Sequence, residues 1–197
     1  MSRSGRQVLQ ASPLLPRSRR IVGRDPRSGP GALFATGATM SRPPRIEGFP
    51  YRGGYQYFLT FCVRDRRPVF LEPSVALLVI NHFLRTSKTW QFALLAYCVM
   101  PDHLHLLVEG LSENSDLRRF AKRLKQGSAQ AYSHDTGMPL WQEGYFDHVL
   151  RAEEDARHIA RYIVENPVRA GLVQHPADYP FIGSGVWALQ DLLYGIS

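Results

Sequence analysis

The chain has 197 residues, of which 44% are hydrophobic, which is enough for one folded domain with a buried core. No apolar run approaches the roughly 18 to 20 residues that a membrane span needs, so we expect a soluble protein. The formal net charge is +7, and it is unevenly distributed along the chain.

The positive charge is concentrated in residues 1–46. This segment holds nine arginines against one acid, Asp25, a net charge of +8, so the remainder of the chain carries −1. It is rich in Ser, Pro and Gly and lacks hydrophobic periodicity, which predicts a disordered basic arm followed by a single domain over 47–197. The arm suits either nucleic-acid binding or simple solvation, and a natural start at Met40 is a further alternative.

The first elements of the domain are a strand and a helix. Residues 55–63 are aromatic and β-branched, a composition typical of a strand, and the polar run 64–68 ends it. From Pro73 to about Lys88, apolar residues recur at helical spacing, which predicts a helix.

The next stretch carries the most information. Residues 92–99 and 103–108 are nearly unbroken apolar runs separated by Pro101-Asp102, which predicts two strands joined by a tight turn. Alternate side chains of a strand share a face, so His103 and His105 project together, roughly 6.6 to 7 Å apart along the strand. Two imidazoles on one face can bind one divalent cation; a pair of hydrogen-bonded histidines on a half-exposed face is the alternative.

A long helix is predicted over 115–133. Its inner stripe is apolar or small, comprising Leu117, Phe120, Ala121, Leu124, Ser128 and Ala131. Its outer face is basic, which suits either a solvated surface or a track for phosphates, and comprises Arg118, Arg119, Lys122, Arg123 and Lys125.

Two further elements complete the pattern. Residues 140–150 read as a strand, and 153–166 as a helix that begins with three acids, where the helix dipole favours them, and stops at Pro167. The order strand, helix, strand, strand, helix, strand, helix predicts an α+β fold, a ferredoxin-like βαββαβ core followed by one more helix. Cys62 and Cys98 lie in predicted strands without Cys-x-x-Cys spacing, so we expect reduced core thiols.

The last of these helices carries a second candidate site. Tyr162 and Asn166 lie one turn apart beside its apolar arc, roughly 5 to 6 Å from each other. A phenol can attack phosphorus, and an amide oxygen can bind a hard cation. The alternative is that Tyr162 flanks the core and Asn166 caps the helix.

Three motifs in this order resemble the REP-associated tyrosine transposases, the single-tyrosine branch of the HUH endonucleases, over about residues 48–182. They are Met-Pro-Asp-His-Leu-His-Leu-Leu-Val-Glu at 100–109, Leu-Trp-Gln-Glu-Gly-Tyr-Phe-Asp-His-Val-Leu-Arg at 140–151 and Tyr-Ile-Val-Glu-Asn-Pro-Val-Arg-Ala-Gly-Leu-Val at 162–173. The resemblance implies a ferredoxin-like fold in which His103 and His105 bind Mg²⁺ or Mn²⁺. Asn166 takes the place of a third ligand, which is Gln in insertion-sequence relatives.

In this family Tyr162 is the expected nucleophile. The resemblance implies cleavage of single-stranded DNA at palindromic repeat hairpins through a 5′-phosphotyrosine link, by a monomer or homodimer in the cytoplasm at the nucleoid. By proximity alone, His158 and Asp102 are candidates for proton transfer. Two other functions stay open: a protein that binds repeat hairpins without cutting them, and a metal-dependent phosphodiesterase that activates water.

Overall fold

A computed structural model describes residues 46–151 and 154–195. The predicted basic arm, apart from its last residue, lies outside these residues. The helices are α1 (Pro73–Thr89), α2 (Leu117–Thr136), α3 (Ala156–Val164), α4 (Asn166–Arg169) and α5 (Leu189–Tyr194), with 3₁₀ turns at Arg64–Arg66, Val69–Leu71 and Pro176–Asp178. The strands are β1 (Gln56–Cys62), β2 (Phe92–Met100), β3 (His103–Gly110), β4 (Phe146–Val149) and β5 (Ile182–Gly183).

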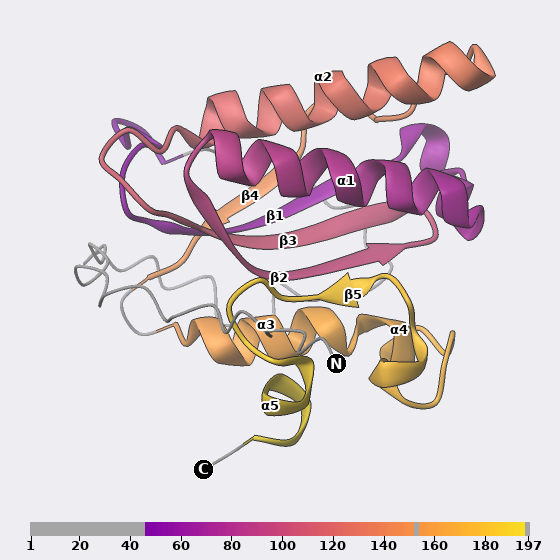
Figure 1. Cartoon of the computed structure of the whole chain (residues 1–197). Helices are drawn as coiled ribbons and strands as arrows, with labels where there is room; N and C mark the ends of the chain where they lie inside the picture. Colours follow the sequence, from indigo (N-terminus) through magenta and orange to yellow (C-terminus); the bar gives the residue numbers. More distant parts are fainter. Residues whose placement is uncertain (1–45, 152–153, 196–197) are drawn as a thin grey trace, which may run out of the picture.

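The strands form one sheet in the order β4-β1-β3-β2-β5, and every neighbouring pair is antiparallel. The first four strands with α1 and α2 make the predicted ferredoxin-like βαββαβ core, and β5 extends the sheet beyond β2. Helices α1 and α2 cover one face of the sheet, while α3, α4 and α5 lie on the other (Figure 1). Both faces of the sheet are therefore covered by helices, and the candidate site residues can lie on either face.

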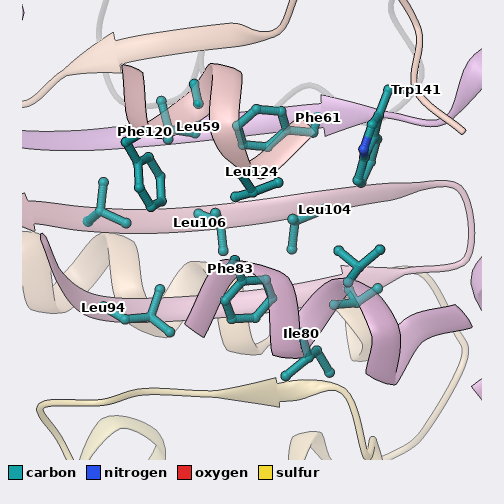
Figure 2. Packing of buried hydrophobic residues seen from close by; sticks show 14 of the residues in the cluster. Leu59, Phe61, Ile80, Phe83, Leu94, Leu104, Leu106, Phe120, Leu124 and Trp141 are labelled. Carbon is teal, nitrogen blue, oxygen red and sulfur yellow. The ribbon is translucent and has the colours of Figure 1, made fainter. Parts of the chain in front are cut away.

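The first core lies between the sheet and the helices α1 and α2, where large apolar side chains from both layers interdigitate (Figure 2). Phe83 and Phe120 are completely buried there. Trp141 closes one end of this core, and its indole Nε1 donates to the Ser128 hydroxyl at 2.9 Å. This polar atom is thereby satisfied within an apolar cluster.

Local signals explain both helices of this layer. Pro73 begins α1, where its missing N–H is not needed, and the Glu72 side chain caps the Ser74 amide. Asp116 caps α2 at the Arg119 amide, and Gly137 ends it with a φ of 70°, a left-handed conformation that favours glycine. On α2 the inner stripe is as predicted except at its end, where Tyr132 is buried in place of Ala131.

Strand β3 contributes side chains to the cores on both faces of the sheet. Leu104, Leu106 and Val108 belong to the first core. Leu107 points the other way into a second core, which also contains Phe58 and the buried residues of α3. The alternation of a strand places His103 and His105 on this second face.

Two predicted elements differ from the structure. The strand over 140–150 is only Phe146–Val149, because Gly144 has a φ of 71° and interrupts it; Trp141 forms an isolated bridge to Val63. The helix over 153–166 is divided at Glu165 into α3 and α4. Pro167 does not stop the chain from being helical, because it lies in the first turn of α4, where proline is tolerated.

Cys62 and Cys98 are both free thiols; Cys98 is buried in the core as predicted, whereas Cys62 is only partly buried. None of the helices within 46–151 and 154–195 is both long and apolar enough to cross a membrane.

Candidate active site

The two histidines of β3 converge at the start of the strand. Their Nε2 atoms are 3.0 Å apart, and the ring centroids are 4.6 Å apart at an interplanar angle of 79°. His105 is buried and stacks on Phe58 at 5.4 Å between centroids, whereas His103 is partly exposed. The pair is therefore reached by solvent from the His103 side, while His105 is packed against the sheet face.

Each imidazole is held at its other ring nitrogen. His103 Nδ1 donates to Asp102 Oδ1 at 2.6 Å, and the second oxygen of Asp102 accepts from Arg66 Nε at 2.9 Å. His105 Nδ1 lies 2.8 Å from the Thr60 hydroxyl, which comes from the neighbouring strand β1 and pairs with His105 in register. Such contacts fix ring orientation and tautomer, and they are typical of histidines that bind metals.

Electrostatics keep His105 neutral. Burial lowers its pKa well below the ordinary value, and the neighbouring His103, Arg169 and Arg66 lower it further. For Asp102, burial alone would raise the pKa, but the hydrogen bond from His103 and the proximity of His103 and Arg66 outweigh burial and lower it. The site thus presents a neutral imidazole beside an ionised carboxylate.

The donor set fits a divalent cation. Ligand atoms 2.0–2.1 Å from an octahedral ion and at right angles to each other are about 2.9 Å apart, close to the separation of the two Nε2 atoms. The Thr60 hydroxyl can donate or accept, so His105 can present a lone pair at Nε2. No group of three His, Cys, Asp or Glu suited to a metal exists in the described part of the chain.

Helix α3 crosses the same face of the sheet (Figure 1). Its Ile159, Ala160, Ile163 and Val164 are buried in the second core, together with the Phe58 ring that stacks on His105. This is the apolar arc predicted from the sequence. On its other side, Arg157 and Arg161 donate to carbonyls of α5, at 2.8 Å and 2.7 Å. The tyrosine-bearing helix is therefore clamped between the sheet and α5.

A histidine–glutamate pair anchors the segment that leads into α3. His148 of β4 has its Nε2 2.9 Å from both carboxylate oxygens of Glu154, and the Arg151 amide donates to the same carboxylate at 2.7 Å. Asp155 then caps α3 at the Arg157 amide. These contacts fix where the tyrosine-bearing helix begins.

Tyr162 is partly buried on α3, and Arg169 covers its ring. The guanidinium carbon of Arg169 is 3.6 Å from the ring centroid, and the same side chain donates to the Tyr162 carbonyl. Burial raises the pKa of the Tyr162 phenol, and the charge of Arg169 and its hydrogen bond oppose the rise. The phenol is thus neutral at rest, with a cation beside it.

Asn166 is buried at the junction of α3 and α4. Its amide nitrogen donates to the carbonyls of Tyr162 and Ile163, both at 3.3 Å, which is a capping contact. The amide oxygen is the atom that can serve a cation. His158, the other polar residue predicted on this helix, is exposed.

The predicted basic face belongs to α2 and lies on the opposite side of the sheet from the histidines (Figure 1). Arg118 lies over the Tyr51 ring, and Arg119 over the Trp90 ring. Lys125 donates to two loop carbonyls, and burial lowers its pKa. Lys122 and Arg123 are exposed. The structure therefore does not bring this face together with His103, His105 and Tyr162.

Sequence reasoning missed three residues that the structure places at the site: Thr60, Arg66 and Arg169. Thr60 contacts His105 across 45 positions of sequence, and no local pattern indicates such a contact. Arg66 stands in the charged run 64–67, which resembles ordinary surface. Arg169 lies within the quoted motif at 162–173, but its spacing from Tyr162 gave no sign that it would cover the ring. Had the pairing of β1 with β3 been predicted, it would have placed Thr60 beside His105, but it would not have identified Arg66 or Arg169.

Comparison with known proteins places the chain among relatives. A model of the family described as "Transposase IS200 like" matches residues 52–166, more than half of the chain. The chain is 30% identical over 132 residues to the REP-associated tyrosine transposase of Escherichia coli (strain K12), covering 66% of this chain and 77% of that protein. A Haemophilus influenzae protein assigned to the same group is 29% identical over 148 residues, covering 66% of this chain and 79% of its own.

A solved structure shares the fold. It is that of a REP-associated tyrosine transposase bound to a REP hairpin, and it matches with a TM-score of 0.60 at 26% identity, over 73% of this chain and 82% of that one.

Proposed function

Because the chain belongs to the IS200-like transposase family and, within it, to the REP-associated tyrosine transposases, we propose that it cuts and rejoins single-stranded DNA at palindromic repeat hairpins through Tyr162. Family membership makes it a DNA-processing enzyme of the transposase type. The chemistry at individual atoms is our proposal.

One observation carries this proposal. The tyrosine-bearing helix α3 packs on the sheet face that holds the converging imidazoles, and Phe58, which stacks on His105, belongs to the cluster that buries the apolar side of α3. A nucleophile and a pair of potential metal ligands thus share a face, as a phosphoryl transfer site requires. A protein that only binds hairpins has no chemical need for this arrangement.

In the proposed reaction, the Tyr162 oxygen attacks the scissile phosphorus. The new bond is a 5′-phosphotyrosine ester, the bond from phosphorus to the 3′-oxygen breaks, and that oxygen leaves as a 3′-hydroxyl after gaining a proton. The phenol loses its proton in the same step. Attack by a 3′-hydroxyl on the ester reverses these changes and rejoins DNA, so no energy source is consumed.

His103, His105 and, through its amide oxygen, Asn166 would hold Mg²⁺ or Mn²⁺. Such an ion, when bound, polarises the phosphate oxygens as a Lewis acid. Asp102 orients the His103 ring rather than acting as a base, because its carboxylate is already engaged by His103 and Arg66. Thr60 orients His105 in the same way.

The test is the covalent adduct. Single-stranded oligonucleotides that fold into palindromic hairpins are incubated with the protein and Mn²⁺, then separated on a denaturing gel. Tyr162→Phe should abolish the adduct, and EDTA should abolish it for the unchanged protein. Tyr132→Phe and Tyr145→Phe are matched controls, since both rings pack in or against the first core, on the other face of the sheet.

An adduct that survives in Tyr162→Phe but not in a control would show that another tyrosine is the nucleophile. Cleavage that continues without any adduct would favour a phosphodiesterase that activates water.

A further inference from the structure

The contact between Arg169 and Tyr162 is more than helix packing. The α3 helix is interrupted at Glu165, and α4 brings Arg169 back over the tyrosine. Glu165 holds the guanidinium at 3.4 Å, and the Tyr162 carbonyl accepts from it. A cation so placed over an aromatic face is bound more tightly than one in free solvent.

Arg169 also lies near the histidine face. Helix α4 packs on β2, and Cys98 of β2 is the register partner of His105. Burial is the largest cause that lowers the pKa of His105, and the charge of Arg169 adds to it; the same charge opposes the rise that burial causes in the pKa of Cys98, which agrees with this placement. The guanidinium therefore belongs to the site rather than to a remote surface.

The side chain is able to take a ligand. It is 31% exposed, so a bound anion can reach it. A guanidinium has five N–H donors. The terminal nitrogens of Arg169 donate to the Glu165 carboxylate and to the Tyr162 carbonyl, and the side chain also hydrogen-bonds to the Tyr162 phenol. Its planar, permanent charge matches the oxygens of a phosphate.

We propose that Arg169 is a catalytic residue, which binds a non-bridging oxygen of the scissile phosphate and holds the Tyr162 ring for attack. This inference rests on the proposed function, because it takes Tyr162 as the nucleophile. Cleavage concentrates negative charge on the non-bridging oxygens, and a fixed cation there stabilises the transition state more than the bound substrate.

The test compares chemistry with binding. Arg169→Ala should lower the single-turnover rate of adduct formation on the hairpin oligonucleotide about 100-fold, the typical effect of losing one such donor. The affinity for the same oligonucleotide should stay within about threefold, because contacts elsewhere dominate binding. Arg169→Lys keeps the positive charge but loses the planar guanidinium that can donate two parallel hydrogen bonds, so its rate should lie between those of Arg169→Ala and the unchanged protein.

Two controls separate this role from support of the fold. Arg85→Ala removes another arginine that bonds to a helix carbonyl, on α1 at the other face of the sheet, and should leave the rate within about threefold of the unchanged protein (Figure 1). Millimolar guanidinium chloride should raise the rate of Arg169→Ala about tenfold or more, but not that of Arg85→Ala.

An Arg169→Ala rate within about threefold of the unchanged protein, or no gain with guanidinium, would overturn the proposal for Arg169. Tyr162→Phe that still forms an adduct would instead overturn the proposed function.

Discussion

Thr60 offers the sharpest test of how the sheet supports the site. Its hydroxyl is buried, 1% exposed, and lies 2.8 Å from His105 Nδ1. Thr60→Val keeps the shape of the side chain but leaves that nitrogen buried without a partner. An unsatisfied buried polar group costs about 1–3 kcal/mol, so the free energy of unfolding without metal should fall by that amount.

The same change should weaken metal binding about 10- to 100-fold, the usual effect of removing a residue that orients a ligating histidine. The assay is a Mn²⁺ titration of the melting temperature, since an ion that binds only the folded state raises it. Thr60→Ser, which keeps the hydroxyl, is the matched control and should stay close to the unchanged protein.

Equal effects of Thr60→Ser and Thr60→Val would refute the reasoning, because only the hydroxyl distinguishes them in hydrogen bonding to His105. If Mn²⁺ did not raise the melting temperature of the unchanged protein, the proposed metal site itself would be wrong.

Two further predictions concern stability. Burial raises the pKa of Glu154, but the contacts with His148 and the Arg151 amide outweigh burial and lower the pKa below its ordinary value of 4.5. The ionised carboxylate therefore stabilises the folded protein above pH 4.5, and this stabilisation is lost as the pH falls through the lower pKa of the folded state. Glu154→Gln should therefore cost about 1 kcal/mol at pH 7 and progressively less below pH 4.5, as urea unfolding at several pH values would show. A Cβ on Gly110 would lie 2.0 Å from the Gly53 carbonyl oxygen, so Gly110→Ala should destabilise by about 2 kcal/mol or more in urea, whereas Gly54→Ala, whose nearest contact is 3.6 Å, should cost about 1 kcal/mol or less.

The parts of the fold that the sequence predicts well are those in which every local signal agrees. The pattern of 92–108 gave both central strands and their turn, because two apolar runs flank Pro101-Asp102. Helix α1 begins at Pro73 as predicted, since proline is favoured at a first helical position. Where signals conflict, prediction fails: 140–150 has the composition of a strand, but Gly144 interrupts it with a left-handed conformation.

The candidate site shows the same division. The His103 and His105 pair follows from strand alternation alone, and Tyr162 with Asn166 follows from helical spacing. The residues that orient them do not, because Thr60 and Arg169 reach the site through strand pairing and through the break at Glu165. Contacts between residues far apart in the chain produce no periodic pattern in the sequence from which they could be predicted.

Strand β3 explains why stability and chemistry can coexist in so small a domain. On one side, Leu104, Leu106 and Val108 are completely buried in the core beneath α1 and α2. On the other side, the same strand presents His103 and His105 to α3. Fixing the apolar side chains in a close-packed core also fixes the backbone from which the imidazoles project, so their convergence requires no loop to close.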